Sequence, residues 1–233
     1  MLTLSTLWTH DVDDVNTNVQ QSFMPRKEAR AGSKHGQRYH HGNLRTALIE
    51  AGLKLIEKKG VRALTLREIG ARVGVSRMAA YRHFADKADL FGAISEAGFA
   101  RFADALDAAR QKAGKSFRSR LKAMAVAYVR FAAEHPAYYE VMFSWADEST
   151  ELTRTPGPSA ARAFGILEET IRQGQEAGEV LAEDSVMLAR LVWAQVHGIC
   201  MLRLAPNVSV NGADTRLVEF CSEVLQKGLA WNR

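Results

Sequence analysis

Cysteine, proline and long apolar runs are scarce in this chain. Of its 233 residues only Cys200 and Cys221 are cysteines, and they lie far apart with no CxxC pair. This usage predicts a reduced, cytoplasmic setting. No apolar run reaches the roughly 20 residues that span a bilayer, and no basic stretch followed by an apolar core opens the chain. We therefore expect neither a membrane partner nor a secretory signal.

The residue patterns of common catalytic sites are also missing. The sequence has no Ser-His-Asp or Cys-His context, no Gly-rich phosphate loop and no metal constellation. The adjacent carboxylates at 168–169 and 183–184 suit a helix surface and a helix N-terminus. His35, His40 and His41 have no carboxylate or thiol at ligand spacing. We expect no enzyme, no catalytic residue, no metal and no cofactor.

Helix-forming residues dominate what is present. Hydrophobic residues make up 47% of the chain, only five residues are proline, and no run of alternating β-branched residues indicates a sheet. The sequence predicts an all-α fold. Its helices are expected at about 43–59, 65–73, 77–84, 87–112, 116–134, 136–145, 158–178, 184–204 and 212–231, with a polar loop at 146–157.

The stretch from Thr65 to Phe84 predicts a helix-turn-helix. Thr65 can cap a first helix, with Glu68 as its capping-box partner, and Gly74 can end it in the left-handed conformation. Ser76 is a good cap for a second helix, whose inward positions are Ala80 and Phe84. The apolar residues of the first helix share one face: Leu66, Ile69 and Val73.

The first turn of the second helix carries the residues that suit a DNA groove. Arg77 can offer a bidentate fork to guanine, while Met78 and Ala79 can touch thymine methyl groups. Phosphate contacts fit Tyr81, Arg82, His83 and Lys87. A short motif of this kind also fits a two-helix corner with solvated charges.

Charge is concentrated around this motif. Residues 26–91 hold 15 Lys+Arg against 6 Asp+Glu, whereas residues 92–233 hold 16 against 17. Such a local basic excess favours a phosphate-binding face over a nonspecific DNA-coating protein, whose basicity would be spread along the chain.

From Leu44 to Leu90 the chain resembles the DNA-binding domain of the TetR family of transcriptional regulators. The resemblance rests on ALIEAGLKLIEKKG, ALTLREIGARVGVS and the Tyr-x-His-Phe-x-x-Lys-x-x-Leu run that begins at Tyr81. It implies that helix residues approach DNA and that others hold its backbone. The expected DNA-binding residues are Thr65, Arg67, Ser76, Arg77, Met78, Ala79, Tyr81, Arg82, His83 and Lys87. The family often has Gly and Thr where this chain has Met78 and Ala79; this departure removes a hydroxyl donor and leaves the operator sequence open.

The predicted organisation has three parts. Residues 1–41 form a disordered tail and a basic arm, which fits either a minor groove or solvent. Translation starting at Met1 or at Met24 fits this stretch equally well. Residues 42–94 form the DNA-binding domain, and residues 95–233 form a helical regulatory and dimerisation domain.

Aromatic residues and methionine are frequent in the second half, where they suit a core or an adaptable ligand pocket. The candidate pocket residues are Phe102, Tyr128, Phe131, Met142, Trp145, Trp193 and His197. His197 fits a hydrogen-bonded core histidine as well as a ligand contact. HPAYYEVMF and WAQVHG resemble the regulatory domain named for its Trp-His-Gly residues, which implies an unidentified small apolar effector.

The same resemblance implies a homodimer in which the last two helices of each chain form a four-helix bundle. The expected interface residues are Leu188, Leu191, Val192, Gln195, Leu202, Leu217, Phe220 and Val224. A dimer of this kind would act as a repressor that the effector releases from a palindromic DNA operator.

Overall fold

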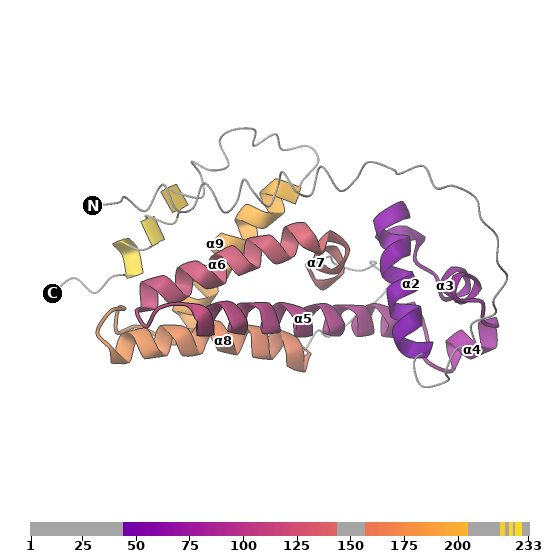
Figure 1. Cartoon of the computed structure of the whole chain (residues 1–233), viewed down its shortest axis with the longest axis horizontal. Coiled ribbons are helices and arrows are strands. Elements are labelled where there is room, and N and C mark those ends of the chain that lie inside the picture. Colours follow the sequence, from indigo (N-terminus) through magenta and orange to yellow (C-terminus); the bar gives the residue numbers. More distant parts are fainter. Residues whose placement is uncertain (1–43, 144–156, 205–219, 222–223, 226, 230–233) are drawn as a thin grey trace. The chain divides into compact units, whose positions relative to one another are not determined.

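The structure is a computed structural model that describes residues 44–143, 157–204, 220–221, 224–225 and 227–229. All the elements in these residues are helices, which confirms the all-α prediction (Figure 1). The predicted tail and arm, Trp145, Leu217 and nearly all of the 146–157 loop lie outside the described residues. The chain divides into two compact units, with the division inside one long helix, between residues 98 and 99.

The first unit holds the described residues up to Gly98 together with residues 135–143. Its elements are α2 (Leu44–Lys59), the 3-10 turn η1 (Val61–Ala63), α3 (Leu66–Val73), α4 (Arg77–Tyr81), the first half of α5 (Lys87–Lys112) and α7 (Pro136–Phe143). The core lies between these short helices and is made of fully buried side chains. Among them are Leu48, Leu55, Leu64, Ile69, Leu90 and Ile94.

Helix α7 joins this unit although it follows the unit's other elements by more than 30 residues. It packs against α2 and, through Met142 and Tyr138, against Gly98 of α5. A Cβ atom at Gly98 would lie 2.7 Å from the Met142 sulfur and 3.0 Å from Cδ1 of Tyr138. The missing side chain at Gly98 therefore lets α5 and α7 approach this closely.

The second unit contains the second half of α5, α6 (Phe117–Glu134), α8 (Pro158–Glu176), α9 (Ser185–Leu204) and the described residues near the C-terminal end. Within it α6 packs against α8 and α9, and α8 packs against α9. The observed bounds of α6, α8 and α9 agree with the predicted ones within two residues.

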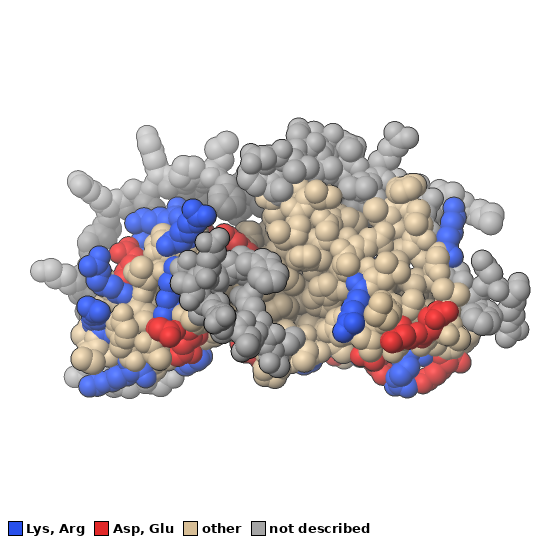
Figure 2. Space-filling view, turned by 180° about the vertical axis from the view of Figure 1, so that it is seen from behind, with Lys and Arg blue, Asp and Glu red and all other residues tan. Residues whose placement is uncertain are grey.

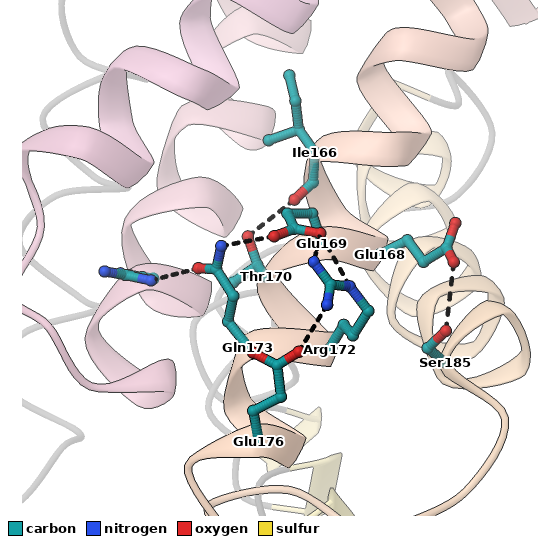
Figure 3. Close-up of polar contacts among 9 residues, drawn as sticks. Ile166, Glu168, Glu169, Thr170, Arg172, Gln173, Glu176 and Ser185 are labelled. Atoms are coloured by element: carbon teal, nitrogen blue, oxygen red, sulfur yellow. Dashed lines mark hydrogen bonds and ion pairs between the residues drawn. The ribbon is translucent and has the colours of Figure 1, made fainter.

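Polar residues on α8 form a chain of contacts along its length (Figure 3). The guanidinium of Arg172 contacts the carboxylates of Glu169 and Glu176, and the amide of Gln173 donates to Glu169. The hydrogen bond from Arg172 lowers the pKa of Glu169 below its usual value, with a smaller contribution from Gln173. On the buried side, the hydroxyl of Thr170 donates to the carbonyl of Ile166 at 2.8 Å, so it satisfies its own polar group.

The start of α6 meets the end of α8 at a glycine. The backbone N–H of Phe117 donates to Oε2 of Glu179 at 2.9 Å, which supplies an acceptor for one of the free N–H groups at the N-terminus of α6. A Cβ atom at Gly174 would lie 2.7 Å from Cγ2 of Val180 and 2.9 Å from Cδ2 of Phe117. Val180 and Phe117 are both buried, so neither has room to yield.

This packing predicts opposite effects for alanine at two glycines of α8. At Gly165 an added Cβ atom would meet no heavy atom within 4 Å, so Gly165→Ala should stabilise the fold by roughly 0.5–1 kcal/mol through helix propensity. At Gly174 the same gain is offset by overpacking that costs roughly 1–3 kcal/mol, so Gly174→Ala should lower stability. Urea unfolding of both variants measures the difference, and equal stabilisation would contradict the close approach.

Candidate nucleic-acid interface and effector cavity

The turn between α3 and α4 is fixed by local hydrogen bonds that the sequence predicts. The hydroxyl of Thr65 accepts from the N–H of Glu68 at 3.2 Å, and that of Ser76 accepts from Ala79 at 3.2 Å. Gly74 ends α3 with φ of 79°, in the left-handed region. The capping box is only half formed, because the Glu68 carboxylate accepts from Arg72 at 3.3 Å.

Helix α4 has only five residues and ends at Tyr81, three residues before its predicted end; it is anchored by its inward residue Ala80 and by Phe84 just beyond it. Ala80 and Phe84 are fully buried, as predicted. The methyl group of Ala80 lies 3.5 Å from the position that a Cβ atom at Gly70 would take, so α3 and α4 are in van der Waals contact there. Burial on this side leaves the first turn of α4 facing outward.

The outward first turn carries Arg77, Met78 and Ala79. Arg77 is exposed, Met78 is 67% exposed and Ala79 is partly buried. The guanidinium carbon of Arg77 lies 5.3 Å from the ring centre of Tyr81, one turn later on α4. A bidentate donor and an exposed apolar side chain thus lie together at the N-terminal end of a helix, the part that reads bases in helix-turn-helix proteins.

The remaining predicted DNA contacts lie on neighbouring parts of the same unit. Thr65, Arg67, Ser76, Tyr81 and Arg82 are exposed, and His83 and Lys87 are partly buried. The ammonium of Lys87 lies 5.4 Å from the ring centre of Phe91. Figure 2 shows Lys and Arg side chains gathered over this unit, with fewer Asp and Glu.

An aromatic cluster lies inside the second unit. The ring centre of Phe102 is 4.8 Å from that of Tyr128, 5.2 Å from Phe131 and 5.8 Å from Trp193. These four predicted pocket residues, with His197, are therefore brought together. Met142 is not, because it lies in the first unit against Gly98.

A small cavity of about 30 Å³ opens beside this cluster. Aliphatic residues supply most of its wall, and the sequence does not single most of them out as pocket residues. An aliphatic residue on a helix face gives the same sequence signal in a core as in a cavity wall. Among the described residues, no charged one lines the cavity. The lining residues are Leu106, Leu121, Met124, Ala125, Tyr128, Leu167, Val192, Trp193 and Val196.

His197 makes a hydrogen bond at the edge of the aromatic cluster. Its Nδ1 lies 3.1 Å from the hydroxyl of Tyr128, and the tautomer decides which group donates. Burial lowers the pKa of His197 below its usual value, so the neutral imidazole is favoured. The structure therefore gives His197 the bonded position that suits a core histidine.

The residues predicted for a dimer interface divide between two sides of α9. Leu188 and Val192 are buried within their own unit, and Val192 lines the cavity. Their side chains therefore pack inside the chain rather than facing a partner. Gln195 donates from Nε2 to the carbonyl of Cys221 at 2.9 Å. Leu191 and Leu202 of α9, with Phe220 and Val224 near the C-terminal end, are exposed.

Helix α9 exposes more large hydrophobic side chains than the other described helices. It is the one helix there that is long and apolar enough to cross a membrane, contrary to the expectation from the sequence, and 28% of that apolar stretch is buried. Core helices of globular proteins meet the same criterion, so the observation by itself identifies an apolar helix with an uncovered side.

Comparison with known proteins assigns both units. Residues 48–94 match the family described as "Bacterial regulatory proteins, tetR family". Residues 121–225 match "Tetracyclin repressor-like, C-terminal domain". Together these matches span more than half of the chain and include α3, α4 and most of the cavity wall.

Individual relatives agree with this assignment. A curated relative, the HTH-type transcriptional regulator AcrR of Shigella flexneri, is 42% identical over 52 residues, which span 22% of this chain and 24% of the relative. A protein of unknown function from Rhodococcus sp. RHA1 is 30% identical, with 84% of this chain and 100% of that chain covered and a TM-score of 0.71. SmeT in its triclosan complex is 21% identical, with coverages of 81% and 92% and a TM-score of 0.60. The chain belongs to the TetR family of DNA-binding transcriptional regulators.

Proposed function

We propose that this regulator is a dimeric repressor that binds a palindromic operator and is released from it by a small, uncharged apolar effector. The observation that carries the proposal is the exposed edge of α4, where Arg77, Met78 and Ala79 follow the Ser76 cap. Buried Ala80 and Phe84 hold the backbone of this edge in place.

Each side chain of the edge suits a different base group. Arg77 can donate two parallel hydrogen bonds to O6 and N7 of guanine, and Met78 can cover a thymine methyl group. Lys87, at the start of α5, offers a point charge that suits a phosphate and carries no sequence information. Arg77 and Lys87 therefore give separable effects on binding.

Substitution of these two cations should separate sequence reading from charge. Arg77→Ala should cost roughly 1–3 kcal/mol on the operator and flatten the preference at one base pair of each half-site. Lys87→Ala should weaken all duplexes alike and lower the slope of log K against log salt by about one. Titration of fluorescent duplexes, an operator selected from random DNA and single-base variants of it, measures both effects at several salt concentrations.

Arg72 provides a matched control, since it lies in the same unit but its guanidinium is ion-paired with Glu68. Arg72→Ala should leave base preference unchanged. If Arg77→Ala left every base preference intact, the assignment of α4 as the reading helix would be wrong.

The uncovered side of α9 supports the dimer. Met187, Leu191, Ala194, Gly198 and Met201 are spaced by four, three, four and three residues, which is the apolar repeat of a helix-helix seam. Three of them are exposed large hydrophobic residues. A second copy of α9 would cover this seam.

Gly198 marks the expected crossing point. A glycine inside a helix costs roughly 0.5–1 kcal/mol relative to alanine. A Cβ atom at Gly198 would meet no heavy atom of its own chain within 4 Å, so nothing within the described residues requires a glycine there. A closely approaching partner helix would.

Gly198→Leu should therefore weaken the dimer at least tenfold, because the side chain would separate the two helices where they cross. Sedimentation equilibrium across the micromolar range measures the dissociation constant. Gly92→Leu is the control, since Gly92 is an exposed helical glycine of α5 that also has nothing within 4 Å. A monomeric wild-type protein at micromolar concentration, or an unchanged dimer in the Gly198→Leu variant, would contradict the seam.

The cavity of the second unit supports an uncharged apolar effector. Its wall offers aliphatic and aromatic surface, and the hydroxyl of Tyr128 lies within hydrogen-bond distance of His197. SmeT, which shares the fold, is described with triclosan bound. A single water occupies about 10–15 Å³ on the same volume scale, so the cavity of about 30 Å³ has room for only a few waters. An effector must therefore move the helices that line the cavity. Such a movement can release the operator only if the effector binds the DNA-free conformation of the protein more tightly than the DNA-binding one.

Toluene and benzoate distinguish an uncharged site from a charged one. Toluene at 100 times its dissociation constant should stabilise the protein by about 2.7 kcal/mol, and benzoate should not. Ala125→Leu should abolish the toluene effect by filling the cavity, whereas Ala123→Leu, also on α6 but not in the wall, should preserve it. Thermal melts report the shifts, and equal shifts in the two variants would place the toluene site elsewhere.

A further inference from the structure

We propose that Tyr81 is a specificity-determining residue that acts by positioning the Arg77 guanidinium for base reading. This inference rests on the proposed role of Arg77 and goes beyond it. The observation is that the Arg77 guanidinium carbon lies over the ring of Tyr81, four residues later on α4, at 5.3 Å from the ring centre.

A contact of this kind constrains Arg77 without using its hydrogen-bond donors. A guanidinium over an aromatic ring is attracted through its face. Its N–H groups lie in its plane and point outward from the edge, so the fork that pairs with a guanine remains available. The ring therefore restricts the long side chain while leaving its reading edge open.

Nothing else among the described residues holds this guanidinium. Arg72, in the same unit, is fixed by the carboxylate of Glu68 at 3.3 Å, whereas Arg77 has no ion pair within the part of the chain that the structure describes. A carboxylate partner would occupy the N–H edge that a base needs. An aromatic partner restrains Arg77 and avoids this competition.

Tyr81 also has the exposure that the role requires. Phe84 and Phe91, the rings beneath Arg45 and Lys87, are buried core residues. Tyr81 is 40% exposed, so packing in the core does not account for an aromatic residue at this position. The tyrosine has two separable parts: a hydroxyl that suits a phosphate and a ring that supports Arg77.

Two substitutions separate those parts. Tyr81→Phe keeps the ring and removes the hydroxyl, while Tyr81→Leu removes the ring and keeps an apolar residue of good helix propensity. Each variant is titrated, as full-length protein, with the selected operator and with every single-base variant of it. The readout is the ratio of two dissociation constants from one protein sample, so a partly inactive preparation does not alter it.

Tyr81→Leu should reduce the preference at the base pair that Arg77 reads by about two- to five-fold, the range of an exposed cation–π contact. Tyr81→Phe should keep that preference and weaken all duplexes alike. In the Arg77→Ala background, Tyr81→Leu should cause no further loss at that base pair, because the group that it positions is gone.

The inference is overturned if Tyr81→Leu weakens all duplexes equally, or if Tyr81→Phe reduces the preference as much as Tyr81→Leu does. It is also overturned if the losses from Arg77→Ala and Tyr81→Leu at that base pair simply add. In each case Arg77→Ala can still flatten one base preference, which preserves the proposed reading helix. If Arg77→Ala flattens no preference, the proposed role of Arg77 falls together with that of Tyr81.

Discussion

The burial of Ala80 and Phe84 is the contact on which the DNA-binding unit depends. Isolated helices shorter than about 12–15 residues are marginal in water, and α4 has five. Its position must therefore come from its inward side, which rests on α3 near Gly70, and from the Ser76 cap. These two buried residues carry the fold, while Arg77 and Met78 in the first turn of α4 are exposed. Under the proposed function, stability and base reading therefore fall to different side chains of one short segment.

A second constraint concerns how the regulatory unit is joined to the first. His135 alone separates the end of α6 from the start of α7. Helix α6 supplies Leu121, Met124, Ala125 and Tyr128 to the cavity wall, and α7 packs against α2 and against Gly98 of α5. Under the proposed function, a displacement of α6 by an effector would reach α7 along the chain through this one residue. Since Gly98 leaves no spare room beside Met142, α7 can move only together with its contacts.

Local signals explain what the sequence can predict. Thr65, Gly74 and Ser76 act through hydrogen bonds or dihedral angles within a few residues. The start of each helix and the turn between them can therefore be predicted from the sequence alone. Long-range packing cannot. Periodicity places Leu188 and Val192 on an apolar helix but does not say which apolar side meets the chain's own core. For the same reason the sequence groups Met142 with the cavity, although Gly98 holds it elsewhere. Local signals can also mislead: the predicted capping box is only half formed, because Arg72 competes for the Glu68 carboxylate.

The apolar residues of α9 would suit either a bilayer or a partner helix, and the polar residues of the helix favour the proposed partner helix. Gln195 and His197 lie near the middle of the helix, where a bilayer would be most apolar. They bond to the carbonyl of Cys221 and to Tyr128, and these bonds belong to a packed helical unit. Arg190 also lies within the apolar stretch, where a bilayer would disfavour its charge. A second α9 would instead cover Leu191 and Met201 and leave Arg190 in water. Gly198 suits this solution, since a helix crossing benefits from a missing side chain at the contact point.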